Sequence, residues 1–249
     1  MLYYVILNNF ILNKMSEESY VKEDFILPRS FYKKLYKLAK IVNNVLVKND
    51  IQYWTEAGTL LGVMRHRGII EWDDDIDIKV WKKDWLKILK PEIKSQFKKL
   101  GYTVVKEKGL NLIKVFPTNA KDGRLNYGFP FLDIFSVTLD KDDPNKVIYT
   151  HKWARDMWKR DYLYLDEMYP LKYAKFGDSE IIIPNNSKKY LDRLFPGWSK
   201  EGRIYQSHVL GIDLEKPVIS KGPFKPAKDF DTKTQIIKAD KIFLSNPYL

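Results

Sequence analysis

Four aspartates crowd into five consecutive positions of this chain: Asp73, Asp74, Asp75 and Asp77. Clustered carboxylates repel one another, so such a cluster indicates that something positive is held beside it. Asp75 and Asp77 alternate with isoleucines, and positions i and i+2 of a strand point to the same face. This spacing predicts two carboxylates on one strand face and two isoleucines in the core. Paired carboxylates suit a hard cation, so we expect Mg²⁺ or Mn²⁺ carrying a phosphate.

A further carboxylate, Asp133, lies in the middle of the apolar run FLDIF. A buried carboxylate is costly unless it is paired or bound to metal. If the strand of Asp133 lies beside that of Asp75 and Asp77, the three groups form a site for one or two metal ions on the phosphates of a nucleotide. In that arrangement Asp133 can also take the proton of an attacking hydroxyl.

A Gly-Thr turn precedes the acidic cluster and fits the same chemistry. Gly58 allows backbone N–H groups to approach a phosphate, and Thr59 adds a hydroxyl at a helix N-terminus. Arg65 and His66 follow and can neutralise phosphates or a leaving diphosphate. They can equally be structural partners of the carboxylates, and a lone Asp-x-Asp is often only a solvated turn.

The remaining histidines, His151 and His208, are isolated in the sequence. We expect a surface or satisfied-core role for both. The tryptophans that recur in pairs at helical spacing favour core packing over base stacking.

The elements that must position these groups follow from hydrophobic periodicity. Helical spacing predicts helices over 28–49, 58–67 and 81–101, the last pausing at Pro91, and alternation predicts strands over 51–58, 74–80 and 129–139. A hairpin around Gly109 is expected over 102–117. The pattern predicts an α+β fold, with a small mixed sheet flanked by helices.

The composition changes near residue 140. A helix is expected over 151–170, then a strand, a turn and a short helix over 177–198, and a loop-rich segment after Gly211. We therefore predict an N-terminal extension (1–27), a catalytic core (28–140) and a helical and loop-rich acceptor-side region (141–249) packed on the core.

The bulk composition restricts the class of protein. The 249 residues carry a net charge of +11 and no cysteine, which excludes disulfides and thiolate metal sites. A basic surface favours phosphate-rich partners, although solvated helix faces account for it equally well. No segment reaches the length of a spanning helix, so we expect a soluble, cytoplasmic protein, with a composition typical of an AT-rich bacterial or viral genome.

The whole run GTLLGVMRHRGIIEWDDDIDI resembles the signature of the LicD family, which includes fukutin and fukutin-related protein. Glu71 stands where that family usually has proline. The run FLDIF, with Asp133, and the later IIIPNN with KKYLDRLFPGW fit looser family patterns. The resemblance covers roughly residues 51–198.

This resemblance implies a nucleotidyltransferase-like fold and transfer of a substituted phosphate, such as phosphocholine or ribitol phosphate, from a CDP-linked donor to a glycan hydroxyl with release of CMP. It implies that Asp75 and Asp77 bind metal with Asp73 supporting or joining them, and that Asp133 binds metal or acts as base. It also implies that Gly58 and Thr59 hold the donor's phosphates and that Arg65 stabilises their charge.

Two other functions remain open. The first is a nucleotidyltransferase that adds NMP from an NTP to RNA, a protein or a small molecule and releases pyrophosphate. The second is a non-catalytic module that binds a polyanion through its basic surface. The acidic cluster argues against this second alternative, and we expect nucleic acid not to be the partner. The oligomeric state is not readable from the sequence.

Overall fold

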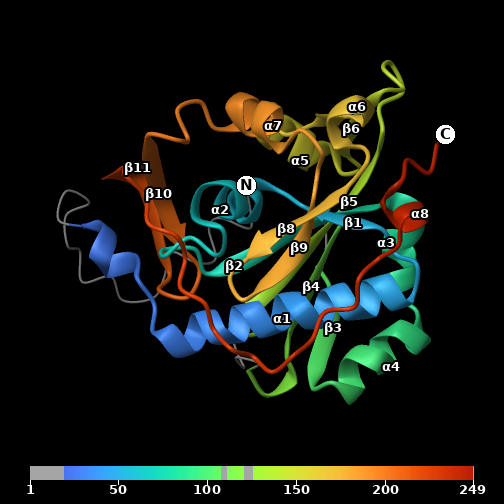
Figure 1. Ribbon diagram of the computed structural model, residues 1–249, viewed down its shortest axis with the longest axis horizontal. Coiled ribbons are helices and arrows are strands. Elements are labelled where there is room, and N and C mark those ends of the chain that lie inside the picture. The colour runs from blue at the N-terminus through green and yellow to red at the C-terminus, as the bar shows by residue number, and fades with distance from the viewer. Residues whose placement is uncertain (1–19, 108–110, 121–125, 249) are drawn as a thin grey trace.

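A mixed β-sheet forms the centre of the molecule in a computed structural model that describes residues 20–107, 111–120 and 126–248. Its strand order is β1-β2-β5-β4-β3, with β6 beside β5 and β7 beside β6 (Figure 1). The β2–β5 pair is parallel and the other pairs are antiparallel. The strands of this sheet are β1 (Tyr53–Thr55), β2 (Asp75–Trp81), β3 (Tyr102–Lys106), β4 (Leu112–Pro117), β5 (Phe131–Leu139), β6 (Lys146–Tyr149) and β7 (Leu163–Tyr164).

Helices flank this sheet, so the expected α+β class with a small mixed sheet is confirmed. The expected helix over 81–101 is divided at Pro91. Pro91 occupies the first position of the second helix, where the N–H that proline lacks would have no partner within the helix. The helical elements are η2 (Lys22–Phe25), α1 (Arg29–Lys48), α2 (Ala57–His66), α3 (Lys82–Ile88), α4 (Pro91–Lys99), η3 (Thr118–Ala120), α5 (Lys152–Met157), α6 (Leu165–Met168), α7 (Ser187–Leu194) and α8 (Lys241–Leu244).

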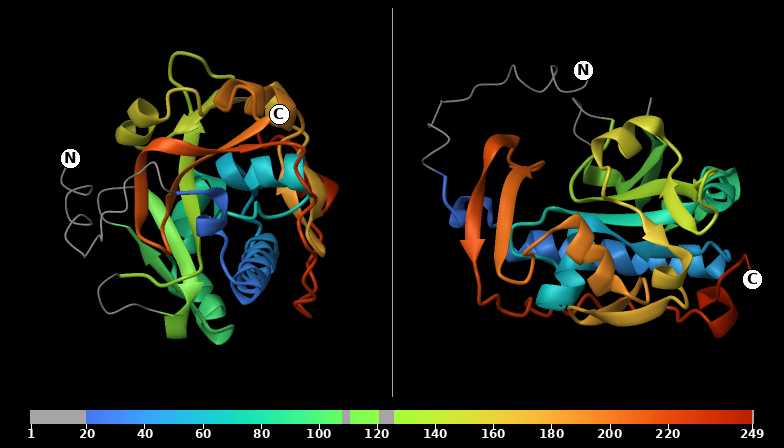
Figure 2. Two further views of the ribbon diagram at one scale, coloured as in Figure 1. Left: turned by 90° about the vertical axis from the view of Figure 1, so that its left-hand side faces the viewer. Right: turned by 90° about the horizontal axis from the view of Figure 1, so that it is seen from above.

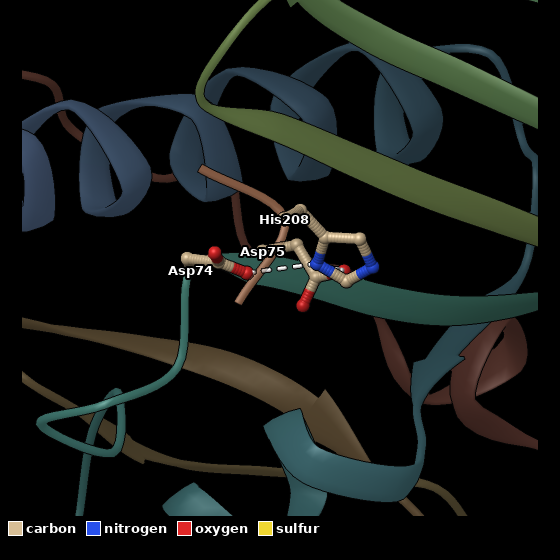
Figure 3. Close-up of side chains that lie close together, drawn as sticks. All are labelled: Asp74, Asp75 and His208. Atoms are coloured by element: carbon tan, nitrogen blue, oxygen red, sulfur yellow. Dashed lines mark hydrogen bonds and ion pairs between the residues drawn. The ribbon is translucent and has the colours of Figure 1, made fainter. Parts of the chain in front are cut away.

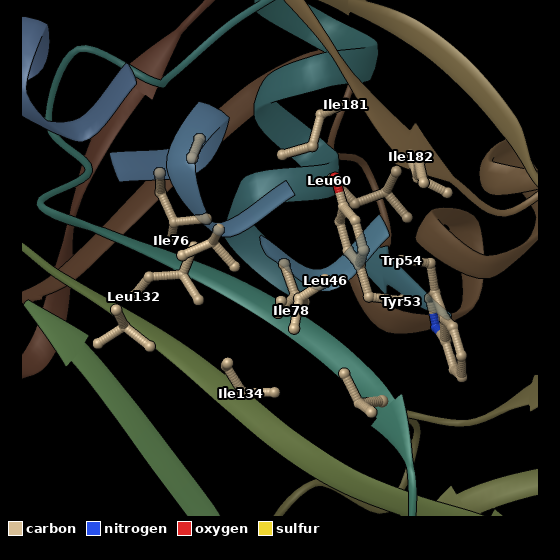
Figure 4. Close-up of a cluster of buried hydrophobic side chains, with 14 of the residues drawn as sticks. Leu46, Tyr53, Trp54, Leu60, Ile76, Ile78, Leu132, Ile134, Ile181 and Ile182 are labelled. Atoms are coloured by element: carbon tan, nitrogen blue, oxygen red, sulfur yellow. The ribbon is translucent and has the colours of Figure 1, made fainter. Parts of the chain in front are cut away.

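One face of the sheet packs into the main hydrophobic core (Figure 4). Ile76 and Ile78 of β2 lie there with Ile134 of β5 and Leu46 of α1, and each is almost fully buried. Because side chains alternate along a strand, the aspartates between these isoleucines face the opposite side of the sheet. The expected alternation therefore separates an apolar face of the sheet from an acidic one.

The region after residue 140 differs in part from expectation. The helix expected over 151–170 is replaced by α5, β7 and α6, because Leu163 and Tyr164 pair with β6 and so extend the central sheet. The segment after Gly211 is not wholly loop-rich: a strand follows at once and forms a hairpin. The two hairpins of this region are β8 (Lys172–Phe176) with β9 (Ser179–Ile183), and β10 (Glu201–Ser207) with β11 (Ile212–Lys221).

A small second core explains why β10 and β11 form. Ile204 and Leu214 of this hairpin are buried with Phe25, Ile70 and Trp72, which come from the N-terminal part of the chain. A strand that finds its apolar partners so far away in sequence gives little local signal. Figures 1 and 2 show this hairpin at one end of the molecule and α8 at the other.

The chain between β11 and α8 runs in extended form along α1. Lys40, Asn43 and Asn44 of α1 donate hydrogen bonds to it. Within the described ranges, no helix combines the length and the apolar character needed to cross a membrane. The turn expected around Gly109 falls outside the described residues, and the division of the chain at residue 140 stays a prediction.

Candidate active site

Three carboxylates meet on the acidic face of the sheet. Asp77 of β2 lies directly opposite Asp133 of β5 in the parallel register, and Asp75 lies two positions before Asp77. One carboxylate oxygen of each residue lies within 4.8 Å of the others. Two neighbouring strands that alternate in phase put such side chains on one face. The structure therefore brings together Asp75, Asp77 and Asp133, which we call the acidic trio.

The start of α2 lies against the acidic trio. Thr59 accepts a hydrogen bond on Oγ1 from the backbone N–H of Asp77 at 2.9 Å, so its hydroxyl also fastens α2 to β2. A Cβ placed on Gly58 would lie 3.1 Å from Oδ2 of Asp73. Ala57 has φ 41°, a left-handed conformation that is strained for a residue with a Cβ. A larger side chain at Gly58 would therefore require the carboxylate of Asp73 to shift.

Asp73 is close to this turn but is not part of the trio. Its backbone N–H bonds the carbonyl of Ile70, so it belongs to a turn and β2 begins only at Asp75. The carboxylate points toward Gly58 instead of following the strand alternation. A role of Asp73 as a metal ligand stays a prediction. Its position fits a residue that supports the metal ligands better than one that binds the metal itself.

A lysine that the sequence analysis did not single out completes one side of the trio. Lys114 of β4 pairs with Asp133 of β5, and its Nζ donates a 2.8 Å hydrogen bond to each carboxylate oxygen. Nζ also lies 3.7 Å from the ring centre of Phe131. The signal in the sequence was a lysine in the middle of the apolar strand LIKVF, since a buried ammonium needs a partner just as a buried carboxylate does.

A histidine from the C-terminal part of the chain borders the other side of the acidic trio (Figure 3). His208 lies in the turn between β10 and β11, and its Nδ1 hydrogen-bonds Oδ1 of Asp74 at 2.9 Å. The same nitrogen lies 3.6 Å from Oδ2 of Asp75. His208 is therefore neither isolated nor a core residue. Its approach depends on a hairpin that folds back over more than half of the sequence.

Burial and mutual repulsion shift the pKa values of the acidic side chains. Burial raises the pKa of Asp75 to about 6, and burial together with the charges of Asp75 and Asp133 raises the pKa of Asp77 well above its ordinary value. Burial also raises the pKa of Asp133, although Lys114 opposes that shift. A divalent cation would favour the charged form of all three, since nearby positive charge lowers a carboxylate pKa. The oxygen-only donor set therefore fits Mg²⁺ or Mn²⁺.

The hydrogen bonds and ring contacts of Arg65 and His66 lie away from the acidic trio, although the charge of Asp73 acts on Arg65, and the phosphate-binding role suggested for both by the sequence stays a prediction. Both lie in the last turn of α2, about 12–14 Å from its start at a rise of about 1.5 Å per residue. Nη1 of Arg65 donates to the carbonyls of Trp198 and Glu201, and its guanidinium lies 4.0 Å from the ring centre of Phe224.

The ring of His66 is buried between Trp72 and Phe224. Burial and the neighbouring Arg65 lower its pKa to about 4, so His66 is neutral at physiological pH. A neutral, enclosed imidazole is a poor phosphate ligand. Both residues therefore hold the β10–β11 hairpin and the following segment against α2.

A buried ionic network lies along the same sheet face. Lys79, two positions after Asp77, forms ion pairs with Glu56 and Asp161. The hydroxyl of Tyr149 lies 2.7 Å from Oε2 of Glu56 and 2.5 Å from Oδ2 of Asp161, and Tyr190 donates to Asp161 at 2.7 Å. Burial raises the pKa of Glu56 to about 8. This network fixes the strand that carries the trio and the turn that begins α2.

Residues 50–186 match a family model described as LicD/FKTN/FKRP, nucleotidyltransferase domain. An uncharacterized protein of Rickettsia prowazekii is 38% identical over 190 residues, which cover 76% of this chain and 64% of the relative. An uncharacterized protein of Rickettsia typhi is 34% identical over 86% of this chain and 65% of its own length. The chain thus spans somewhat less than two thirds of these relatives.

A shorter match joins this chain to the human ribitol 5-phosphate transferase FKRP, with 36% identity over 66 residues, or 26% of this chain and 13% of FKRP. Among solved structures, the lincomycin-bound lincosamide antibiotic adenylyltransferase LnuA is similar, with a TM-score of 0.35 and 15% identity over 62% of this chain and 81% of that one.

Proposed function

Because the chain belongs to the LicD family, whose domain is described as a nucleotidyltransferase domain, we propose that it is a metal-dependent phosphotransferase. The transferred group is a substituted phosphate of the phosphocholine or ribitol phosphate kind, the donor is CDP-linked, the acceptor is a glycan hydroxyl, and CMP is released. The observation that carries this proposal is the register that sets Asp77 opposite Asp133, with Asp75 beside them.

The acidic trio would hold Mg²⁺ or Mn²⁺. When bound, such an ion neutralises the charge of the phosphates and orients the phosphoryl group. The surroundings support this assignment because the three carboxylates are oxygen donors that disfavour one another's charge without a cation. The N–H groups at the start of α2, around Gly58, are suited to the phosphate oxygens.

In the proposed step, the oxygen of the acceptor hydroxyl attacks the phosphorus next to the transferred alcohol. The bond from that phosphorus to the bridging oxygen breaks, and CMP leaves with the electron pair. The hydroxyl proton passes to Asp133. Its raised pKa suits a proton acceptor, and the ammonium of Lys114 holds the carboxylate in place.

The kind of group transferred is supported by the likeness to FKRP over 66 residues, since that relative is named a ribitol 5-phosphate transferase. The match covers only a quarter of this chain, so donor and acceptor remain part of the proposal. A second candidate is NMP transfer from an NTP, which the description of the family domain favours. The two reactions differ in product: CMP for the first and pyrophosphate for the second.

The decisive experiment combines thermal shift with product analysis. CDP-choline, CDP-ribitol, CDP, CTP and ATP are tested with Mg²⁺, with Mn²⁺ and with a chelator. We expect metal-dependent stabilisation by the CDP compounds, lost in Asp77→Ala and kept in Asp142→Ala, a matched change of an exposed aspartate. Stabilisation by triphosphates alone, with pyrophosphate as product, would favour the second candidate.

A further inference from the structure

The turn that joins β10 to β11 is held at the acidic trio by one buried carboxylate. Asp74 accepts hydrogen bonds from Oγ of Ser207 at 2.7 Å, from Nδ1 of His208 at 2.9 Å and from the backbone N–H of Val209 at 2.9 Å. Three consecutive residues of a distant turn therefore share one acceptor. We call these three hydrogen bonds to Asp74 the clamp. Because Asp74 immediately precedes β2, the clamp holds the β10–β11 turn beside the trio.

The clamp also fixes how the imidazole of His208 is oriented. Nδ1 is taken by Asp74, and the second ring nitrogen, Nε2, points away from that carboxylate (Figure 3). In the described part of the chain Nε2 has no hydrogen-bond partner, and the side chain is 34% exposed. A carboxylate on Nδ1 keeps the proton there and leaves Nε2 for another group.

The charges around the ring indicate which group that is. His208 packs against Phe131, with ring centres 5.3 Å apart, and Nζ of Lys114 lies over the same phenyl ring. Two basic side chains that border the trio, those of His208 and Lys114, therefore contact the same aromatic ring. Nδ1 of His208 lies 2.9 Å from a carboxylate oxygen of Asp74 and 3.6 Å from one of Asp75, and an imidazolium held by two carboxylates donates from both of its ring nitrogens. A positively charged hydrogen-bond donor is suited to bind a phosphate oxygen.

We propose that His208 binds a phosphate oxygen of the donor's diphosphate through Nε2–H, and that Asp74 is the positioning residue that aims it. The CDP-linked donor and its diphosphate rest on the proposed function, whereas the free imidazole nitrogen beside the acidic trio follows from the geometry. His208 then contributes to the site a hydrogen-bond donor from the C-terminal part of the chain.

The test uses two amide substitutions with opposite geometry. The amide nitrogen of Asn can replace Nδ1 and keep the bond to Asp74, and that of Gln can reach toward the place of Nε2. We expect His208→Asn to weaken binding of inorganic pyrophosphate and of CDP, both with Mg²⁺, by about ten- to hundredfold, the range of a lost hydrogen bond to a charged group. His208→Gln should recover part of this loss.

Calorimetry gives these affinities, and Mn²⁺ binding followed by paramagnetic resonance gives metal affinity without nucleotide. Asp74→Asn should weaken pyrophosphate binding in the same direction, and the Asp74→Asn, His208→Asn double variant should be no weaker than His208→Asn alone. Asp213→Asn, an exposed change on the same hairpin, is the control.

An unchanged pyrophosphate affinity in His208→Asn would overturn the proposal. So would an equal loss of Mn²⁺ affinity, because His208 would then be a metal ligand. If His208→Asn kept full affinity for pyrophosphate while His208→Gln lost it, only the bond to Asp74 would matter, and the role of His208 would be structural. A wild type that binds pyrophosphate through His208 but ignores CDP would refute the proposed function and leave this inference standing, and a wild type that binds neither would refute both.

Discussion

Lys114 and Asp133 face each other across β4 and β5, and the ammonium donates one 2.8 Å hydrogen bond to each oxygen of the carboxylate. Both residues are buried, at 7% and 6% relative exposure. The pair gives the acidic trio a built-in counter-charge on one edge. In the part of the chain that the structure describes, no lysine forms such a pair with Asp75 or Asp77, and the basic group beside Asp75 is His208.

The first prediction concerns this pair. Lys114→Met should destabilise the protein by about 3–5 kcal/mol, because it leaves a buried carboxylate without its partner. Asp133→Asn in the same background should recover much of the loss, since no uncompensated charge remains. Urea unfolding in the presence of a chelator measures both, with Lys99→Met at an exposed position as control. Purely additive effects of the two changes would contradict the coupling.

The second prediction concerns the repulsion between Asp75 and Asp77. Asp77→Asn should stabilise the metal-free protein by about 1 kcal/mol at neutral pH, because raised carboxylate pKa values mean that charging these groups opposes folding. The same variant should lose the stabilisation given by Mn²⁺. Thermal melting with and without Mn²⁺ checks this. A variant that is less stable without metal and still responds to Mn²⁺ would contradict both statements.

The third prediction is a pH dependence that belongs to His208. Its folded pKa of about 9 lies above its ordinary value of 6.5, so its contribution to stability is complete below pH 6.5 and is lost as the pH rises toward 9. The difference in unfolding free energy between wild type and His208→Asn should therefore be largest near pH 6 and smallest near pH 9.5. Urea unfolding in a chelator gives this difference, in which the other titrating groups largely cancel. A gap that does not narrow with pH would argue against a protonated His208.

The fourth prediction concerns the network of Glu56, Lys79 and Asp161. Lys79→Met should cost about 3–5 kcal/mol, because the buried carboxylate of Asp161 loses the ammonium that balances its charge. Glu56→Gln should cost less than about 1 kcal/mol at neutral pH, since burial already raises the pKa of Glu56 to about 8 and one carboxylate balances one lysine. Chemical unfolding ranks the two variants. An equal cost for both would mean that Glu56 is charged in the folded protein.

The acidic trio was predictable because its signals are local. Alternation of Asp75 and Asp77 with isoleucines fixed the face of the strand, and the cost of burying Asp133 identified it as a partner. The period of two and the price of an unpaired charge are both read from a few neighbouring residues. The same reasoning correctly indicated a mixed sheet flanked by helices and the break at Pro91.

The sequence by itself therefore determined the fold class, the family and the carboxylates of the candidate site. Only the tertiary structure decided which basic groups stand beside them: Lys114 and His208 border the trio, whereas Arg65 and His66, adjacent to the motif, are directed elsewhere. The reason is physical. Alternation along one strand is a local property, but the partner of a charge depends on strand register, on the direction of a helix and on where a distant hairpin packs, and these are settled only when the whole chain is folded.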